Sequence, residues 1–266
     1  MRYIIDHDFH IHSRLSSCSS DPEQMTERIL KYASENGFNK ICISDHYWDS
    51  AVSGASDWYQ SQNFDHIKAS LPLPQSDSCK FLFACETDMD KNFRLGIPKE
   101  RYDDFDFIIV PTTHLHMTNF TYLPEEDNVK DKARLYVQRF EAFLDSDLPF
   151  HKTGIAHLTA NLILAKNDEY FKVLDSIDDA TFKRLFARCA ELGCGVELNI
   201  HLHQIADEKL AQTIIRPYLI AKEQGCKFYL GSDAHHPYEL DEARERFERI
   251  IDILDLSEDD KFHIGK

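Results

Sequence analysis

The segment Asp8-Phe9-His10-Ile11-His12 follows the first apolar run of the chain and decides how the rest of the sequence is interpreted. Side chains two residues apart in a β-strand point to the same side, so His10 and His12 can present two imidazole nitrogens to one cation. Histidine is the commonest metal ligand in proteins. The segment therefore predicts a metal site at the end of the first strand.

Further His, Asp and Glu clusters stand at or just beyond the ends of later apolar runs. They are Asp45-His46, Glu86 with Asp88, His114 with His116, His157, and Asp233 with His235 and His236. Parallel α/β barrels carry their sites at the carboxyl ends of their strands. Because most of the 14 histidines fall at such ends, the pattern predicts one metal cluster assembled from several strands.

Apolar runs alternate with amphipathic stretches along the chain, which is typical of parallel strands joined by helices. The expected strands are Tyr3–Ile11, Lys40–Ser44, Phe81–Thr87, Phe105–Pro111, Gly154–His157, Gly195–Asn199 and Lys227–Gly231. The expected helices are Pro22–Asn36, Val129–Leu144, Thr181–Leu192, Glu208–Gln224 and Tyr238–Leu254. No Pro-, Gly- or Ser-rich linker divides the series, so we expect residues 1–266 to form a single domain, an α/β barrel.

Two local patterns refine this expectation. Asp21-Pro22 predicts the start of the first helix and Gly37 its end. The last helix carries an apolar stripe that we expect to face the core, formed by Leu240, Ala243, Phe247, Ile250, Ile251 and Leu254. The long connections Tyr47–Lys80 and His116–Lys132 contain aromatic residues, and loops of this length are often functional.

Composition and charge narrow the classes of partner. A net charge of −16 argues against an extended nucleic-acid surface but allows a small anionic substrate. No apolar run approaches the roughly 18 residues of a membrane span, so we expect no membrane contact. Seven cysteines without a C-x-x-C pair indicate reduced thiols, and with no expected export signal they favour a cytoplasmic location. The oligomeric state stays open.

An ordered set of motifs resembles the polymerase-and-histidinol-phosphatase superfamily of metal-dependent phosphoesterases. The matching segments are Asp8-Phe9-His10-Ile11-His12-Ser13, Ser44-Asp45-His46, Cys85-Glu86-Thr87-Asp88, Thr113-His114, Gly154-Ile155-Ala156-His157-Leu158, Val196-Glu197-Leu198-Asn199 and Gly231-Ser232-Asp233-Ala234-His235. The resemblance implies a distorted (β/α)7 TIM-like barrel that holds two to three divalent ions at the strand ends.

The resemblance also implies a ligand set. One ion would be held by His10, His12, Glu86 and Asp233, and Glu86 would bridge to a second ion held by His114 and His157. His46 and His235 would contribute to a third ion. Its usual further ligand is a histidine after the H-x-H motif, which is missing here, so Cys18 and Asp21 are the candidates. His116 is an alternative to His114.

The residue types agree with this chemistry. Mixed imidazole and carboxylate ligands suit Zn, Mn or Fe better than Mg or Ca. A bridging carboxylate holds two ions close enough to clamp a phosphoryl transfer, which assigns Glu86, Asp233 and His235 to catalysis. Asp8 and Asp45 are expected to fix the tautomers of neighbouring imidazoles.

The substrate implied is a small phosphomonoester, with histidinol phosphate as one candidate. In the histidinol-phosphatase branch, one phosphate-binding arginine stands two residues after the position of Asn199, where this chain has His201. A second stands shortly after the position of His157, where Lys166 is the first cation here. A protonated His201 and Lys166 are therefore the expected substrate-binding residues.

Two other classes remain open. Metal-dependent amidohydrolases also open with H-x-H and close with a late Asp, although they usually bridge their metals with a lysine. A non-catalytic metal-binding module would fit an incomplete third site. Stoichiometric metal without turnover of any phosphoester would favour that module.

Overall fold

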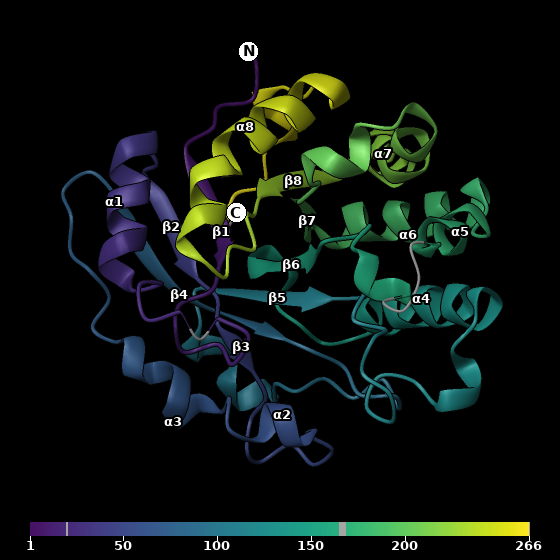
Figure 1. The fold of residues 1–266 in the computed structure, drawn as a ribbon, viewed down its shortest axis with the longest axis horizontal. Helices are drawn as coiled ribbons and strands as arrows, with labels where there is room; N and C mark the ends of the chain where they lie inside the picture. The colour runs from purple at the N-terminus through teal and green to yellow at the C-terminus, as the bar shows by residue number, and fades with distance from the viewer. Residues whose placement is uncertain (20, 165–168, 266) are drawn as a thin grey trace.

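The computed structural model describes residues 1–19, 21–164 and 169–265, which form a nearly closed barrel of parallel strands (Figure 1). The strands follow the order β1-β2-β4-β5-β6-β7-β8, and β3 pairs with β4 beside this path. Their bounds are β1 His7–Ile11, β2 Lys40–Ile43, β3 His46–Tyr47, β4 Lys80–Thr87, β5 Phe107–Pro111, β6 Thr153–Ala156, β7 Gly195–Leu198 and β8 Lys227–Leu230. Neighbours in the sheet are thus neighbours along the chain, and the predicted seven-stranded (β/α) barrel is confirmed.

Hydrogen bonds outside the regular ladder bring β8 against β1. The Leu230 N–H donates to Nε2 of His7 at 3.1 Å. Beyond the strand, the Asp233 N–H donates to the His10 carbonyl at 2.7 Å, and the His12 N–H donates to the Ala234 carbonyl at 3.1 Å. The first and last motifs of the sequence therefore meet at one edge of the barrel.

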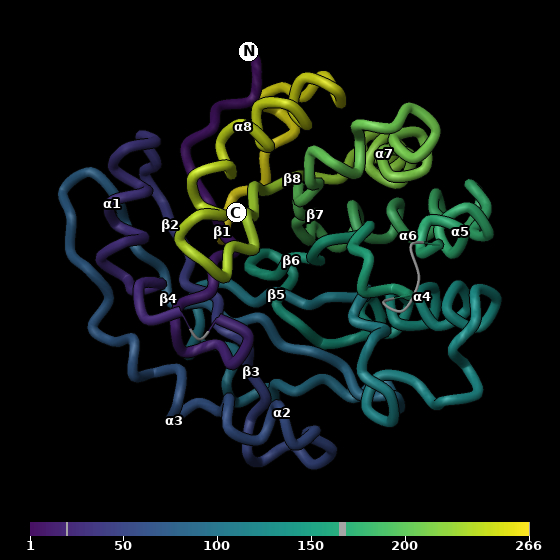
Figure 2. Tube along the Cα trace, in the orientation of Figure 1, coloured from purple at the N-terminus to yellow at the C-terminus, as the bar shows by residue number. Residues whose placement is uncertain are grey.

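Helices cover the outside of the barrel, and Figure 2 shows the N-terminal segment running beside α8. The helices are α1 Thr26–Asn36, α2 Asp57–Gln60, α3 Phe64–Ile67, α4 Val129–Leu144, α5 Tyr170–Asp175, α6 Asp179–Leu192, α7 Glu208–Glu223 and α8 Pro237–Leu254. The expected apolar stripe of α8 is buried along its length. No helix in the described part of the chain is both long and apolar enough to cross a bilayer.

The start of α1 differs from the prediction. The helix begins at Thr26 rather than Pro22, although it ends at the expected Gly37, whose φ of 68° suits glycine. The residues before Thr26 turn back onto the strand end instead. Gln24 accepts the Arg14 N–H through its backbone carbonyl at 2.7 Å and donates its side-chain amide to the His12 carbonyl at 2.9 Å. These bonds fix the segment after β1 against the site.

Apolar side chains fill the barrel from both faces of its strands. A small inner cluster draws one or two residues from most strands and consists of Phe9, Cys42, Leu82, Ala84, Phe107, Ile109, Ala156, Tyr229 and Phe262. Alternate residues of the same strands face outward and join the larger core beneath the helices. The interior of the barrel is thus filled by side chains, and the polar side chains lie at the carboxyl ends of the strands.

A register shift in β1 sets the direction of its side chains. Asp8 pairs with Ile41 but Ile11 pairs with Ile43, so β1 carries one residue more than β2 over this stretch. Phe9 packs on Tyr229 inside the barrel, and His10 also turns inward to reach Glu197. Asp8 points outward, where Tyr32 of α1 donates to it at 3.0 Å. Asp8 and His10 are two residues apart but point to opposite faces, because the extra residue breaks the alternation, so Asp8 does not lie beside the imidazole that it was expected to orient.

The two long connections pack on each other at the mouth of the barrel. Trp48 and Tyr59 from the first connection contact Phe120 from the second, with ring centroids 5.3 Å and 5.4 Å apart. The first connection also contains α2 and α3, which sequence periodicity did not predict because each is only four residues long. Tyr59 of this aromatic contact lines the site described next.

Candidate metal centre

The strand ends bring all of the expected principal ligands together. They are His10 and His12 after β1, His46 in β3, Glu86 in β4, His114 after β5, His157 after β6, and Asp233 and His235 after β8. Their ligating atoms form three overlapping groups, each with all atoms within 4.8 Å of one another. Glu86 belongs to two of these groups, and so does His12.

The first group has the dimensions of a metal site. His10 Nε2 and His12 Nε2 face each other at 3.1 Å, and Asp233 Oδ1 lies 3.3 Å and 3.1 Å from them. Glu86 Oε2 lies 3.6 Å from His10 Nε2 and 3.4 Å from His12 Nε2. A tetrahedral ion with bonds of about 2.0–2.1 Å separates its ligand atoms by about 3.3 Å. These four residues therefore fit a divalent transition-metal ion.

The second group uses the other oxygen of Glu86. Glu86 Oε1 lies 3.0 Å from His157 Nε2 and 3.9 Å from His114 Nε2. His116 lies outside the three groups found among the described residues, and its ring meets that of His114 edge-on at 5.4 Å. The geometry thus favours His114 over His116 as a ligand. Glu86 can bridge two ions in this arrangement.

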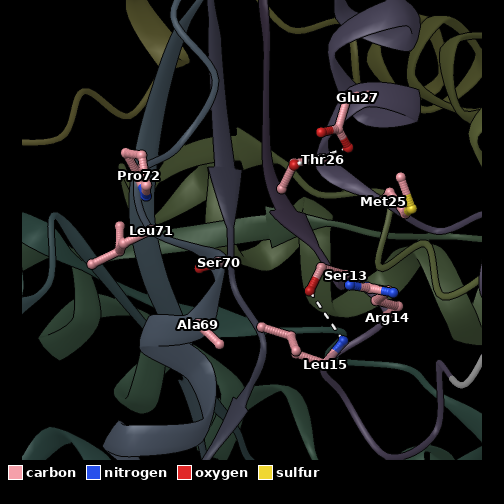
Figure 3. Close-up of a pocket in the computed structure, with 10 residues that line it drawn as sticks. All are labelled: Ser13, Arg14, Leu15, Met25, Thr26, Glu27, Ala69, Ser70, Leu71 and Pro72. Carbon is pink, nitrogen blue, oxygen red and sulfur yellow. Dashed lines mark hydrogen bonds between the residues drawn. The ribbon is translucent and has the colours of Figure 1, made fainter.

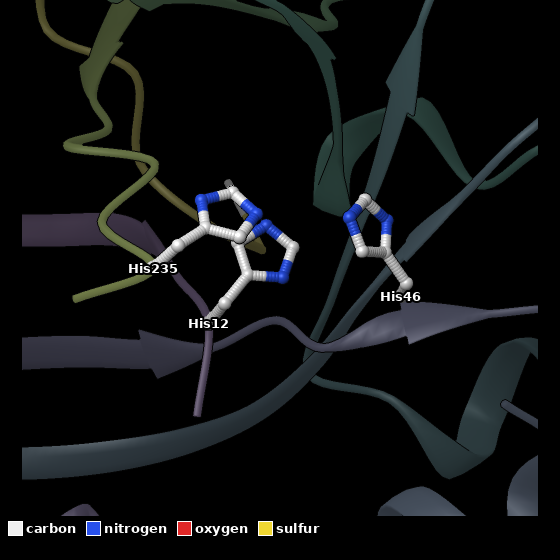
Figure 4. Close-up of side chains that lie close together, drawn as sticks. All are labelled: His12, His46 and His235. Atoms are coloured by element: carbon white, nitrogen blue, oxygen red, sulfur yellow. The ribbon is translucent and has the colours of Figure 1, made fainter. Parts of the chain in front are cut away.

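The third group consists of His12, His46 and His235 (Figure 4). The rings of His12 and His235 stack at 4.1 Å, and the ring of His46 lies 4.4 Å from that of His12. His46 Nδ1 and Glu86 Oε2 are 2.9 Å apart but not aligned for a hydrogen bond, and neither atom makes a hydrogen bond to another described residue. A buried carboxylate oxygen and a ring nitrogen at this distance without a hydrogen bond between them fit a cation.

Four of the histidines have their second ring nitrogen fixed by a neighbour. Thr113 Oγ1 lies 2.8 Å from Nδ1 of His157, and Asp88 Oδ2 lies 3.1 Å from Nδ1 of His114. The other two pairs are Glu197 with His10 and Ser16 with His12, at 2.6 Å and 2.8 Å from Nδ1. A proton held on Nδ1 leaves the Nε2 lone pair for the metal.

Asp45 acts on His12 through a serine. Its carboxylate accepts from the Ser16 hydroxyl at 2.7 Å, and the same hydroxyl oxygen lies 2.8 Å from His12 Nδ1. Because the Ser16 proton is donated to Asp45, His12 Nδ1 must be the donor toward Ser16. Asp45 also accepts the N–H and hydroxyl of Ser13. Asp8 accepts the backbone N–H of His10 at 3.2 Å and contacts no imidazole of the cluster in the described structure.

Glu197 was not assigned a role from the sequence, yet it joins two sides of the site. Its Oε1 accepts from His10, and its Oε2 accepts the backbone N–H of His157 at 2.6 Å. Gly231 makes room for this carboxylate, since a Cβ there would lie 2.0 Å from Glu197 Oε1. The useful sequence signal was the alternation of side chains along β7, which places Glu197 on the same inward face as Tyr229 opposite it, next to the glycine that follows β8.

The electrostatics of the cluster follow from its burial and its carboxylates. Burial favours the neutral form of His12, but its hydrogen bonds with Asp233 and Glu86 outweigh burial and raise its pKa to about 9. Burial would likewise raise the pKa of Glu86, yet the charges of His46 and His10 hold it well below its usual value. The carboxylates of Glu86 and its neighbours are therefore ionised, and divalent cations neutralise their charge better than protons do.

Two ligand positions sit on unusual backbone. Asp233 has a φ of 55° and His157 a φ of 28°, both in the left-handed region that non-glycine residues rarely adopt. Such strain persists only where the surroundings enforce it, and it collects at functional sites. The hydrogen bonds of the Asp233 and His157 N–H groups to the His10 carbonyl and to Glu197 supply that enforcement.

Two hollows flank the cluster and share Asp233, His235 and Leu162 as a common wall. One, of about 480 Å³, is lined by the aromatic side chains of Trp58 and Tyr59 among others. The other, of about 390 Å³, contains Arg246 and polar side chains. A third hollow, between residues 13–15, 25–27 and 69–72, has a single carboxylate and no group of metal ligands in the described structure (Figure 3).

The remaining predicted residues lie around these hollows. Cys18 lines the aromatic hollow, where desolvation and the charges of Asp233 and Glu86 raise the pKa of its thiol. Asp21 faces His236 Nδ1 at 3.6 Å instead of the cluster. His201 lines the Arg246 hollow, but partial desolvation and the charge of Arg246 lower its pKa to about 4, so it is neutral near pH 7. Lys166 lies outside the described residues.

Comparisons with known proteins agree with this geometry. A family model described as PHP domain matches residues 8–254. Histidinol phosphate phosphatase from Lactococcus lactis subsp. lactis, solved with zinc, L-histidinol and phosphate, is similar with a TM-score of 0.56 and 19% identity over 92% of this chain and 93% of that chain. The structure of a protein described as putative histidinol phosphatase from Listeria monocytogenes is also similar, with a TM-score of 0.58 and 14% identity over 88% of this chain and 97% of that chain. A search of curated proteins found no match.

Proposed function

Because the chain belongs to the PHP-domain family, we propose that it is a metal-dependent phosphoesterase that hydrolyses a small phosphomonoester. The observation that carries this proposal is the overlap of two ligand groups through the carboxylate of Glu86, with the third group directly beside them. Overlapping groups with a shared carboxylate are the arrangement that holds neighbouring ions against one phosphoryl group. Zn, Mn and Fe suit the mixed nitrogen and oxygen ligands.

Each principal ligand has a distinct part in the proposed reaction. His10, His12, Glu86 and Asp233 would hold one ion and Glu86, His114 and His157 a second, while His46 and His235 would contribute to a third, because the single free lone pair of His12 on Nε2 serves one ion. The bound ions would lower the pKa of a water molecule and neutralise charge on the phosphoryl oxygens. The Asp233 side chain is 25% exposed and borders both hollows, so its free oxygen can accept the proton of an attacking water.

His235 can serve beside Asp233 in the same step. Its Nδ1 lies 2.7 Å from the Asp233 carbonyl oxygen, which fixes a proton on Nδ1 and leaves Nε2 unprotonated. Burial lowers the pKa of His235 to about 3, so the ring is neutral at physiological pH and suited to ligation. This supports His235, with Glu86 and Asp233, as part of the catalytic set.

The aromatic hollow supports a leaving group with an apolar or ring-bearing body. Trp58 stands edge-on to His46 with ring centroids 4.9 Å apart, and Met117 and Leu162 complete the apolar lining. Histidinol phosphate is one candidate of the right size and chemistry for a hollow of about 480 Å³. The bound histidinol and phosphate of the Lactococcus lactis protein support testing it first.

The test is phosphate release by protein reconstituted with manganese or zinc, using histidinol phosphate and phenyl phosphate side by side. We expect Glu86→Gln to lower the rate by about 100-fold or more, because the bridging carboxylate is lost. Glu223→Gln, an exposed change at the end of α7, is the matched control. Full activity of Glu86→Gln contradicts the proposal, and so does bound metal without release from any phosphomonoester, which would favour a non-catalytic module.

A further inference from the structure

The hollow that contains Arg246 lies directly beside the candidate metal centre, and Arg246 itself belongs to none of the ligand groups found among the described residues. The hollow shares His157, Asp233 and His235 with the ligand groups. Its remaining wall includes Asn199, His201, His203 and Arg246. A space of about 390 Å³ with one guanidinium and several hydrogen-bond donors has the composition of an anion site, in a chain whose net charge is −16.

Arg246 enters this hollow from α8, far along the chain from the motifs of the strand ends. Its side chain is only 5% exposed. Nη2 donates to Asn199 Oδ1 at 2.9 Å, and Nη1 donates to the Ser232 carbonyl at 3.3 Å. Both partners are neutral, and no ion pair joins Arg246 to a carboxylate among the described residues. Arginine stays protonated at any physiological pH, so the charge is permanent.

Two residues that line this hollow each have a buried donor that lacks a hydrogen-bond partner in the described structure. These donors are Nε of Arg246 and Nδ2 of Asn199, whose residue is also 5% exposed. The orientation of the Asn199 amide is fixed, because its oxygen accepts from Arg246. The NH2 group of Asn199 is therefore the end of the amide that has no hydrogen-bond partner in the described structure. Buried donors without acceptors cost free energy, and a bound acceptor would recover that cost.

The carboxylate of Glu239, which also lines the hollow, is already engaged. It accepts the backbone N–H groups of His235 and His236 at 2.6 Å and 3.0 Å. Both bonds go to Oε2 and form the start of α8, and Arg246 donates to Asn199 and Ser232 rather than to Glu239. The hollow thus keeps its donors for a ligand.

We propose that this hollow is an oxyanion subsite in which Arg246 and Asn199 bind an acidic group of the substrate next to the metal centre. The inference rests on the proposed phosphoesterase function and adds Arg246 as its specificity-determining cation. The oxyanion is either the phosphoryl group that is transferred or a second acidic group on the same substrate. In both cases a residue of α8 supplies the charge that the strand ends of this chain lack.

Inorganic phosphate is the first probe, titrated by calorimetry into manganese-reconstituted wild type and Arg246→Met. Loss of a charge-assisted contact predicts about 10- to 100-fold weaker binding. Arg246→Lys should restore part of it, and Asn199→Asp should weaken it while keeping an oxygen for Arg246. Arg249→Met, an exposed change on the same helix, is the control.

The second probe is the pair phenyl phosphate and 4-carboxyphenyl phosphate. Weaker phosphate binding in Arg246→Met assigns the subsite to the transferred phosphoryl group. Unchanged phosphate binding with a KM that rises only for the carboxylated substrate assigns it to a second acidic group. Unchanged phosphate binding with unchanged KM for both substrates overturns the proposal, as does an equal fall in kcat for both with KM intact, which would indicate a purely structural Arg246.

These measurements separate the subsite from the proposed reaction. If the wild type hydrolyses phosphomonoesters and the Arg246 variants bind phosphate and substrate as well as the wild type does, the subsite is refuted and the phosphoesterase function stands. Phosphate binding that depends on Arg246 in a protein that hydrolyses no phosphomonoester would leave the subsite and remove the proposed function. Arg246→Lys keeps the test valid where Arg246→Met fails to fold.

Discussion

Glu197→Gln tests whether the centre depends on the group that orients its first ligand. The carboxylate is fully buried and accepts two short hydrogen bonds, from His10 Nδ1 and from the His157 N–H, both at 2.6 Å. Glutamine has the same shape but only one acceptor oxygen. If that oxygen faces the His157 N–H, the amide NH2 faces His10 Nδ1, and the His10 proton must move to Nε2.

That proton would stand where the first metal group forms, because His10 Nε2 lies 3.1 Å from His12 Nε2. Losing one buried charge-assisted bond costs about 1.5–3 kcal/mol. This free energy corresponds to a metal affinity about 10- to 150-fold weaker. A loss of that order is typical when a group that orients a ligating histidine is replaced.

The assay is competition for zinc against a chelator of known affinity, with metal content measured after dialysis. Glu223→Gln is the control for the loss of one surface carboxylate. Circular dichroism checks that Glu197→Gln is folded. A folded Glu197→Gln protein with the zinc affinity of the wild type would refute the role assigned to this carboxylate.

Three further changes test other parts of the structure. His114→Gln should lower metal content whereas His116→Gln should not, since only His114 Nε2 approaches Glu86; the reverse result would exchange their roles. Gly231→Ala should weaken metal binding like Glu197→Gln, because its Cβ would lie 2.0 Å from the Glu197 carboxylate, and a zinc affinity equal to wild type would contradict this. Partial burial would raise the pKa of Asp6, but its hydrogen bond to His7 and the charges of His7 and Lys261 hold it below the usual value. Its stabilisation is therefore fully present above the unfolded pKa of about 3.9 and is lost as pH falls through the much lower folded pKa. Asp6→Asn should thus cost about 1 kcal/mol at pH 7 and progressively less below about pH 4, and urea unfolding that shows the same cost at about pH 7 and about pH 2 would contradict this.

Much of the fold could be predicted because each strand combines an apolar run with a polar end. The positions of His46, Glu86, His157 and Asp233 follow from strand ends alone, since parallel strands bring those ends to one edge. The start of α1 could not be predicted from the Asp21-Pro22 pair, because the bonds of Gln24 to the β1 end compete with helix formation.

The groups behind the ligands were harder to predict. Ser16 and Thr113 are ordinary polar residues in the sequence, and only the folded chain shows which ring nitrogen each one meets. Arg246 did carry a signal, because it stands three residues after Ala243 on the buried stripe of α8, where a charge is unexpected. Its partner Asn199 lies on a different strand end, so the contact itself required the structure.

The extra residue in β1 puts two consecutive side chains, Phe9 and His10, on the inner face of the barrel. Deleting Phe9 would restore regular pairing with β2, and His10 and His12 would still face inward, because Ile11 keeps its place opposite Ile43. The barrel would instead lose the ring that packs on Phe107 and Tyr229. The cost of the deletion would therefore fall on the packing that supports the ligands, and a relative without this residue would keep the full ligand set.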